Sequence, residues 1–539
     1  MADVLVTHSY HLPFDPKQLR KMQPYMPLAT LYAATALRDN GFSVAAFDPM
    51  LQDPSRGFLR ALAEHRPPIV AVYEDDFNFL SKMCLTRMRE IAWRMAAAAH
   101  AIGAVTIVHG SDATDNPSMF LENGFDYVCC GEAEETLVQL CSFILREETA
   151  PLPLVPLKEV LLKLDGVVML DEFRQMIAGP QRLAKNPHWT ELSFAARDLI
   201  DLEPYRRAWT DAHGYFSVNM VSSRGCPYHC NWCAKPISGN RFQLRPPAAV
   251  AAEIKFLKEN IGAQHVWFGD DIFALDHQWV RDFAAEVTRT GASLPFKIQS
   301  RANLMTTETV ENLRLAGCSE VWMGVESGSQ AVLDAMDKGL DLSSVITARA
   351  RLKSAGVRAC YFLQFGYPGE SWHELRQTIS FVRETRPDDI GVSFTYPLPS
   401  TVFYERVREQ LGLKRNWADS DDLCIMFKAS HNTDFYQAVR NALHAEVDSW
   451  NIANSTVPNL NASKSNHANS TAANSNAANP ASTSADLDAL WRHVEELEPL
   501  SRNPDALTSL ESPASLKSTT VFAAASIVPV GQLASARSE

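Results

Sequence analysis

The chain has 539 residues, of which 46% are hydrophobic and 21% charged, as in a soluble globular protein of about three domains. Its formal net charge of −13 at pH 7 argues against electrostatic capture of nucleic acid or of an anionic membrane. Because the start of the chain lacks a signal-peptide pattern and its longest apolar run is too short to cross a bilayer, we expect a cytoplasmic protein with no integral membrane span and a small-molecule substrate.

The first 150 residues alternate short apolar runs with segments whose apolar residues have helical spacing. Strands are expected at residues 4–7, 43–48, 69–73, 105–109 and 127–130, and helices at 28–40, 82–102 and 134–145. This order is typical of a doubly wound parallel sheet, so residues 1–150 are predicted to form an α/β domain of flavodoxin type.

Residues 151–215 are rich in proline and have no sustained period, which favours a connecting segment. The alternation resumes over residues 216–410. Strands are expected at 217–223, 265–269, 296–300, 320–325, 359–365 and 390–395, with helices beginning near Pro247, His277, Thr307, Gln330, Ser371 and Val402. Six βα units predict a partial (β/α)6 barrel, two units short of a closed eight-stranded one.

The chain after the barrel divides into two further parts. Residues 411–450 are expected to form a helical extension. Residues 451–539 are interpreted as a low-complexity linker and tail, with one short helix near 485–498. The linker is dominated by Asn, Ser, Ala and Thr, which bury too little apolar surface to offset the entropy lost on ordering.

Three of the ten cysteines, Cys226, Cys230 and Cys233, form a C-x-x-x-C-x-x-C cluster just after the first predicted barrel strand. Ten unevenly spaced cysteines do not make a disulfide scaffold, and the other seven are expected to be buried apolar residues. Three neighbouring thiolates suit zinc or an iron–sulfur cluster. A zinc site with His229 or a distant residue as fourth ligand is one interpretation, although the sequence has no second C-x-x-C or H-x-x-x-H cluster to pair with it.

With Trp232 directly before the last cysteine, the triplet resembles the signature of radical S-adenosylmethionine (SAM) enzymes. The resemblance implies that Cys226, Cys230 and Cys233 ligate a catalytic 4Fe-4S cluster whose open iron binds SAM. It further implies that Trp232 contacts the bound cofactor. It also implies that an electron from an external donor, such as flavodoxin or ferredoxin, cleaves SAM to methionine and a 5′-deoxyadenosyl radical. The six βα units agree with the partial barrel of that family.

Polar residues that end the second and third barrel strands extend the resemblance. Asp270 lies in a segment similar to the acidic stretch that meets the methionine amino group of SAM, whereas Asp271 could equally be a helix cap. Ser300 and Arg301 end the third strand, where related enzymes place groups that bind ribose and carboxylate. The Arg301 guanidinium suits a bidentate contact with the SAM carboxylate. The alternative is that Arg301 is an exposed surface residue.

Two further turns match the family pattern. Glu326 lies in Gly-Val-Glu-Ser-Gly-Ser after the fourth strand, which resembles a turn whose glutamate faces the ribose and methionine of SAM. Gly369 follows the fifth strand in Phe-Gly-Tyr-Pro-Gly-Glu, which resembles the loop that borders the adenine. Pro-Gly turns are common, so this second likeness depends on its order and spacing relative to the others.

The first domain resembles the cobalamin-binding domains that are fused to radical SAM enzymes. The likeness is carried by residues 25–32, 41–48, 109–113 and 127–136, the last of which includes the turn Gly-Glu-Ala-Glu-Glu-Thr. The cobalt-ligating motif Asp-x-His-x-x-Gly does not occur in the first 150 residues, and His109 is expected to be a structural strand-end histidine. Asp48, Glu74 and Asp75 could line the corrin edge or form a solvated acidic rim.

These features together resemble the subgroup of class B radical methyltransferases and anaerobic magnesium-protoporphyrin monomethyl ester cyclases. The resemblance implies three cofactors, namely a 4Fe-4S cluster, SAM and cobalamin. The leading hypothesis is a C-methyltransferase that acts on an unactivated carbon of a small molecule. A cobalamin-dependent radical oxidative cyclase or rearrangement enzyme is the alternative, and a non-catalytic zinc-binding protein is a distant one.

Overall fold

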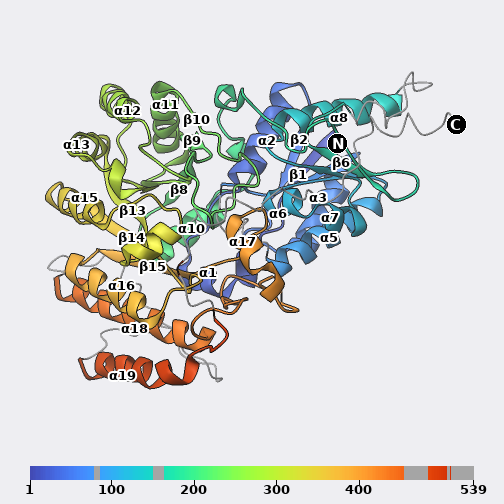
Figure 1. Ribbon diagram of the computed structural model, residues 1–539. Helices are drawn as coiled ribbons and strands as arrows, with labels where there is room; N and C mark the ends of the chain where they lie inside the picture. The colour runs from blue at the N-terminus through green and yellow to red at the C-terminus, as the bar shows by residue number, and fades with distance from the viewer. Residues whose placement is uncertain (78–84, 150–162, 415, 455–483, 507–509, 511–539) are drawn as a thin grey trace.

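The computed structural model describes residues 1–77, 85–149, 163–414, 416–454, 484–506 and 510 (Figure 1). Over these residues the strands form a seven-stranded sheet, a six-stranded sheet and a small two-stranded sheet. The seven-stranded sheet belongs to the amino-terminal half, and the six-stranded sheet lies beside it in the picture, with helices on its outer side. No helix in the described part of the chain is long and apolar enough to cross a membrane.

The first sheet has the flavodoxin-type order. Its parallel part is β2-β1-β3-β4-β5, formed by β1 (Val4–Thr7), β2 (Val44–Phe47), β3 (Ile69–Tyr73), β4 (Val105–His109) and β5 (Tyr127–Cys129). Helices α2 (Leu28–Asp39) and α8 (Glu134–Thr149) share one apolar core with one face of the sheet. Helices α3 (Pro54–His65) and α5 (Thr86–His100) share another core with the opposite face. Burial on both faces explains why β1 and β3 are continuous apolar runs.

The predicted connecting segment is more ordered than its sequence indicated. Within it, β6 (Val167–Leu170) pairs antiparallel with β5, β7 (Met176–Ala178) pairs with β6, and α10 (Glu203–His213) follows. Residues 150–162 lie outside the described part. These two strands have only three or four residues and lie in a segment whose sequence has no sustained period, which is why they were not predicted.

The second sheet confirms the predicted six-stranded partial barrel. Its strands are parallel and run in chain order: β8 (Ser217–Met220), β11 (His265–Phe268), β12 (Phe296–Ser300), β13 (Cys318–Glu326), β14 (Arg358–Phe365) and β15 (Asp389–Phe394). Its helices include α11 (Pro247–Phe256), α12 (His277–Thr290), α13 (Thr307–Ala316), α14 (Gln330–Ala335), α15 (Leu342–Ser354) and α16 (Trp372–Thr385). Parallel strands in one sheet bring all six carboxyl ends to a single edge.

Local signals explain where these helices begin. The Asp276 side chain accepts a hydrogen bond from the Trp279 backbone and caps α12, while Ser371 and Glu374 form a reciprocal capping box on α16. After the barrel come α17 (Val402–Val407) and α18 (Thr433–Asn454), which packs against β15, and α19 (Ser484–Ser501), which packs on α18. The predicted linker at 455–483 lies outside the described residues.

Buried polar contacts join the two large sheets. Asn219 of β8 accepts a hydrogen bond from the Met26 backbone N–H and donates one to the Met26 carbonyl, both at 2.8 Å. Trp209 of α10 donates from its indole nitrogen to the Pro24 carbonyl at 2.7 Å. Leu28 of α2 also lies in the same apolar core as the barrel strands. The first barrel strand is therefore fixed directly to the segment that begins α2.

We expect Asn219→Ala to lower the free energy of unfolding by about 2 to 4 kcal/mol, because two buried backbone groups of Met26 lose their partners. The thermal midpoint should fall by several degrees in calorimetry. Asn312→Ala is the matched control, since Asn312 is a half-buried residue whose side chain donates only to the Glu308 carbonyl within α13. Equal midpoints for the two variants would contradict this account of the interface.

Candidate active site

The three clustered cysteines lie on one loop at the carboxyl edge of the barrel. This cysteine loop, residues 225–242, connects β9 (Ser223–Arg224) to β10 (Gln243–Leu244), and the two strands pair antiparallel. Cys226, Cys230 and Cys233 are half-buried and carry thiols that are not joined in disulfides. The loop therefore presents three thiols from a segment whose two ends are tied together by the strand pair.

The donor set fits an iron–sulfur cluster bound by three protein ligands. No group of three or more His, Cys, Asp or Glu among the described residues is placed to hold a metal ion by itself, and His229 is exposed. The thiols of a cluster bind different iron atoms, so they need not converge on one point as ligands of a single ion do. Within the same described residues, Trp232 Nε1 is buried and has no hydrogen-bond partner, a donor that a bound cofactor can satisfy.

Two side chains fix the cysteine loop from within. Asn231 donates from its amide to the Ala335 carbonyl at 2.8 Å, and its backbone N–H donates to the Met336 carbonyl at 3.1 Å. Lys235 donates from its ammonium to the Cys226 carbonyl at 3.0 Å and also to the Tyr228 carbonyl. The loop is thereby attached to the end of α14 and folded back on itself.

Asp270 lies beneath the start of the cysteine loop. Its carboxylate accepts hydrogen bonds from the Ser222 hydroxyl at 2.6 Å and the Ser223 hydroxyl at 2.5 Å, and from the Ser222 backbone N–H. Burial raises the pKa of Asp270 to about 6, although these hydrogen bonds act to lower it. The structure thus gives Asp270 a role in holding the strand that leads to Cys226. Its contact with the methionine amino group stays a prediction.

Arg301 is a buried residue at the cysteine loop, so the alternative of an exposed surface arginine is wrong. It is 4% exposed, its guanidinium lies 3.8 Å from the centre of the Tyr228 ring, and Nη1 is 3.9 Å from Cys230 Sγ. Nη2 donates to the carbonyls of Lys338 and Gly339 at 2.5 and 2.9 Å. A fixed positive charge therefore stands beside the middle cysteine.

Glu326 ends β13 and forms a buried ion pair with Lys338, whose Nζ lies 2.7 Å from Glu326 Oε1. The backbone of Glu326 is left-handed, with φ of 64°, a conformation that is rare and costly for a residue with a side chain. Lys338 Nζ also lies 6.0 Å from the centre of the Trp232 ring. Sequence patterns gave no signal for Lys338, because it lies in a loop after α14 and not at a strand end.

Ser300 ends its strand and Gly369 lies in the turn after its strand, as expected. Ser300 has a hydrogen-bond partner within the protein, and Gly369 has a left-handed backbone. The Ser300 hydroxyl donates to the Phe273 carbonyl at 2.7 Å. Gly369 is buried in the turn after β14, with φ of 88°. In the same turn, the Tyr367 hydroxyl donates to the Asn231 side chain at 3.1 Å, which links this turn to the cysteine loop. Their contacts with SAM stay predictions.

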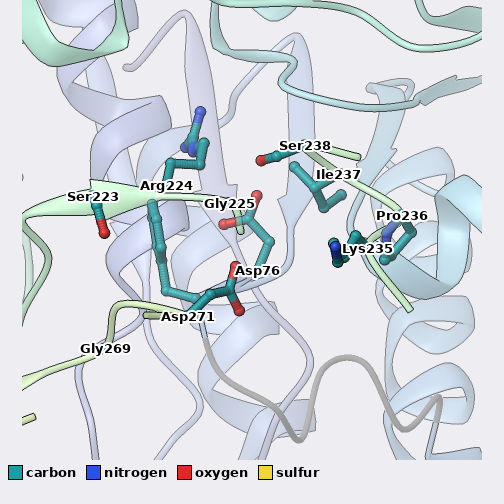
Figure 2. A pocket seen from close by; sticks show the side chains of 11 residues that line it. Asp76, Ser223, Arg224, Gly225, Lys235, Pro236, Ile237, Ser238, Gly269 and Asp271 are labelled. Atoms are coloured by element: carbon teal, nitrogen blue, oxygen red, sulfur yellow. The ribbon is translucent and has the colours of Figure 1, made fainter. Parts of the chain in front are cut away.

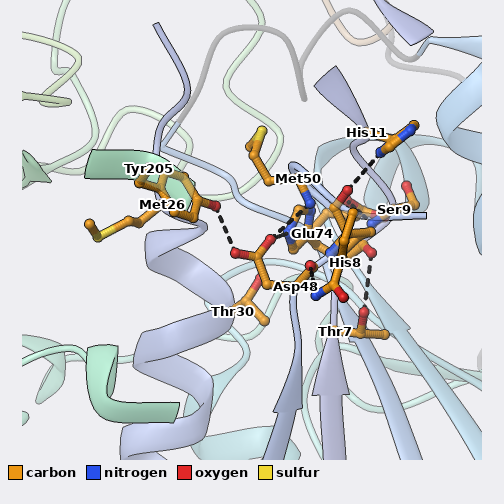
Figure 3. Close-up of polar contacts among 12 residues, drawn as sticks. Thr7, His8, Ser9, His11, Met26, Thr30, Asp48, Met50, Glu74 and Tyr205 are labelled. Carbon is orange, nitrogen blue, oxygen red and sulfur yellow. Dashed lines mark hydrogen bonds and ion pairs between the residues drawn. The ribbon is translucent and has the colours of Figure 1, made fainter. Parts of the chain in front are cut away.

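Acidic side chains follow β2 and β3 of the other sheet and lie beside His8 and Ser9, which follow β1 (Figure 3). Asp48 pairs with His8 at 2.9 Å and accepts from the Tyr205 hydroxyl at 2.7 Å, and Glu74 accepts from the Ser9 backbone at 3.1 Å. Burial raises the pKa of Asp75 to about 6. Asp48 and Asp75 are buried and Glu74 is half-buried, so the three carboxyl groups do not form a solvated rim. His8 was missed because a lone histidine carries no spacing signal.

His109 has the structural role expected of it. It is fully buried, its ring is stacked on Tyr73 with centroids 3.8 Å apart, and Nε2 lies 2.9 Å from the Gly131 carbonyl oxygen. Burial lowers the pKa of His109 to about 4, so the ring is neutral at pH 7. A neutral, stacked imidazole supports the turn at Gly131.

A cavity that is open to solvent lies between part of the cysteine loop and the first domain (Figure 2). The first domain contributes Asp76 and Phe77, and the barrel contributes Gly269 and Asp271. The remaining lining residues belong to β9 and the cysteine loop: Ser223, Arg224, Gly225, Lys235, Pro236, Ile237 and Ser238. The cavity is thus shared between the two halves of the molecule.

Comparison with known proteins assigns a family to each half. Residues 23–141 match the B12 binding domain, and residues 220–382 match the Radical SAM superfamily. Residues 220–382 therefore carry a radical SAM domain, and a B12-binding domain precedes it in the chain. The radical SAM domain implies a 4Fe-4S cluster and SAM, and the B12-binding domain implies cobalamin. The match also favours a cluster over zinc at the three cysteines.

Individual relatives agree with this assignment. The chain is 26% identical over 245 residues to an uncharacterized methyltransferase of Pyrococcus horikoshii, which covers 45% of this chain and 52% of that protein. It is 24% identical over 324 residues to the anaerobic magnesium-protoporphyrin IX monomethyl ester cyclase of Cereibacter sphaeroides, covering 57% of this chain and 49% of that one. The chain therefore matches about half the length of these curated relatives.

A solved structure shares the fold across both domains. The radical SAM methyltransferase TsrM from Kitasatospora setae, with cobalamin and a 4Fe-4S cluster bound, superposes with a TM-score of 0.59. The superposition covers 76% of this chain and 75% of that one at 19% identity. The arrangement of a B12-binding domain followed by a partial barrel is thus common to the two proteins.

Gly225 sets the path into the cysteine loop, and we expect Gly225→Ala to impair cluster binding. Its φ is 81°, and a Cβ there would lie 2.3 Å from the Arg241 carbonyl oxygen. Gly239→Ala is the control, because Gly239 has φ of 60° but open space around it. Iron and sulfide per chain after anaerobic reconstitution should fall below half of wild type in Gly225→Ala alone. Equal losses in both variants would assign the effect to backbone strain.

Proposed function

We propose that this protein transfers a methyl group to an unactivated carbon of a small molecule, using a 4Fe-4S cluster, SAM and cobalamin. The observation that carries the proposal is the cavity shared by the cysteine loop and the B12-binding domain. A substrate in that cavity would lie between the source of a radical and the carrier of a methyl group. The methyltransferase names of the Pyrococcus relative and of the Kitasatospora structure support the same reaction class.

When bound, the cluster and SAM supply a 5′-deoxyadenosyl radical, and cobalamin supplies a transferable methyl group. Overall, two SAM molecules, one substrate R–H and two electrons give R–CH₃, S-adenosylhomocysteine, methionine and 5′-deoxyadenosine. The substrate C–H bond would break, its hydrogen would pass to the 5′-deoxyadenosyl radical to give 5′-deoxyadenosine, and a C–C bond would form to a methyl carbon that derives from the second SAM. The electrons come from an external donor of the flavodoxin or ferredoxin kind.

The residues of this chain would orient SAM at the loop. Arg301, beside Cys230, places a positive charge for the SAM carboxylate. Glu326, held by Lys338, offers a carboxylate at the top of β13 for the ribose or the amino group. Trp232 Nε1 offers an unsatisfied donor. Asp270, Ser300 and Gly369 contribute chiefly by fixing the strands and turns that surround the site.

Cobalamin-dependent oxidative cyclisation is a second candidate. The sequence match to the cyclase of Cereibacter sphaeroides supports it, because that match covers 57% of this chain. In that reaction no methyl group is transferred from SAM to the product. The two candidates need the same cofactors and the same cavity, so they differ in product and not in architecture.

A product assay separates these candidates. With reductant, SAM, cobalamin and a panel of small-molecule substrates under anaerobic conditions, we expect 5′-deoxyadenosine and S-adenosylhomocysteine to accumulate together in about equal amounts. The measurement is chromatography with mass detection, with deuterated methyl SAM to follow the methyl group. If a substrate is converted and 5′-deoxyadenosine forms without S-adenosylhomocysteine, methyl transfer is excluded, and cyclisation or rearrangement becomes the proposed reaction.

Loss of one cluster ligand should abolish radical formation. We expect Cys230→Ala to produce no 5′-deoxyadenosine while its thermal midpoint stays near that of the wild-type apoprotein, because the thiol is half-buried and contributes little packing. Cys424→Ala is the control, since Cys424 is also a free, half-buried cysteine but lies outside the loop. Deoxyadenosine formation by Cys230→Ala would remove that residue from the ligand set.

A further inference from the structure

Both ends of the cysteine loop are held by one turn of the B12-binding domain. We call residues 131–136, Gly-Glu-Ala-Glu-Glu-Thr, the acidic turn. Arg224, two residues before the first cysteine, donates from both terminal nitrogens to the Glu134 carboxylate, at 3.2 Å for Nη1. Arg241, at the other end of the loop, donates to the Glu132 carboxylate. Two glutamates that are two residues apart thus contact the start and the end of the loop.

These ion pairs are buried on the side of the acidic turn. Glu132 and Glu134 are each 1% exposed, and Arg224 is 4% exposed, whereas the Arg241 side chain is half-buried. A buried charge without its partner is strongly destabilising. The two glutamates must therefore stay paired with Arg224, just before the cysteine loop, and Arg241, near its end. The contact between the domains is therefore specific in position as well as in charge.

Further contacts make the acidic turn rigid. The Asn186 backbone N–H donates to Glu132 at 3.0 Å, its side-chain amide donates to Glu134 at 3.1 Å, and its carbonyl accepts from Gln243 of β10 at 3.1 Å. Gly131 has φ of 84°, and a Cβ there would lie 2.6 Å from the Ala184 carbonyl oxygen. A turn packed this closely cannot shift without disturbing β10.

The arginine at the start of the loop is fixed on its faces as well as at its tip. Its guanidinium carbon lies 5.1 Å from the centre of the Phe77 ring and 4.9 Å from that of Trp189. Phe77 also lines the cavity shared by the two domains. Arg224 therefore contacts both the acidic turn and the cavity wall, and it lies only two residues before the first cysteine.

We infer that the acidic turn is a clamp that positions the cysteine loop, so that Glu132 and Glu134 are positioning residues for the cluster although they belong to the other domain. The inference rests on the proposed function, because it concerns how the cluster is held relative to the B12-binding domain. Removing either negative charge frees one end of the loop. The cluster should then lose iron more easily and respond differently to SAM.

The test uses the full chain, reconstituted anaerobically with iron, sulfide and cobalamin, as wild type, Glu132→Gln and Glu134→Gln. Glutamine keeps the shape of the side chain and removes its charge. We expect iron release to a chelator to be about tenfold faster in each variant. The change that SAM causes in the electron paramagnetic resonance spectrum of the reduced cluster should also be altered, while the absorbance of bound cobalamin is retained.

Glu286→Gln is the matched control, because it neutralises a glutamate in a surface pair with Arg289 on α12. If Glu134→Gln does not fold, Glu132→Gln decides the question, since its partner Arg241 can be solvated. Wild-type release rates and spectra in a folded variant would overturn the clamp. A wild-type chain that holds no cluster would instead overturn the proposed function.

Discussion

The cysteine loop has no helix or strand between β9 and β10, so the position of each thiol depends on contacts supplied by other elements. Asn231 attaches its middle to α14, Arg301 packs on Tyr228, and Asp270 holds the strand that enters it. A parallel sheet makes this possible because it brings its carboxyl ends to one edge. The partial barrel is thus best understood as a frame for one irregular loop.

Two buried carboxyl groups around the cysteine loop differ in pKa because one is paired with a positive charge and the other with neutral hydroxyl groups. Burial acts to raise the pKa of Glu134, but the positive charge and hydrogen bonds of Arg224 outweigh it and lower the pKa to about 2. Asp270 has neutral hydroxyl partners, and burial raises its pKa to about 6. The stabilisation from the Glu134 pair is present above the ordinary glutamate pKa and is lost only as pH falls toward 2. The contact between the domains therefore stays charged at neutral pH.

Sequence patterns predicted the elements that have a period and the site residues that end a strand. The six barrel strands, Cys226 to Cys233 and the strand-end position of Arg301 follow from local rules. Helix α3 was missed although Asp53 and Pro54 signal its start, and α15 has no side-chain cap to mark it. Lys338 and Glu134 acquire their roles only through partners brought together by folding, which a local pattern cannot encode.

The same division explains why the cofactors are readable from the motifs and the substrate is not. In the proposed function the cysteines and strand-end residues meet a fixed chemical group, which would constrain their spacing. The cavity, by contrast, is lined in part by Asp76 and Phe77 of the first domain and by residues 236–238 of the cysteine loop. Loop residues can change without disturbing the sheets that hold the cofactor residues. A clamp at both ends of the loop lets its cavity-facing side vary while the thiols keep their positions.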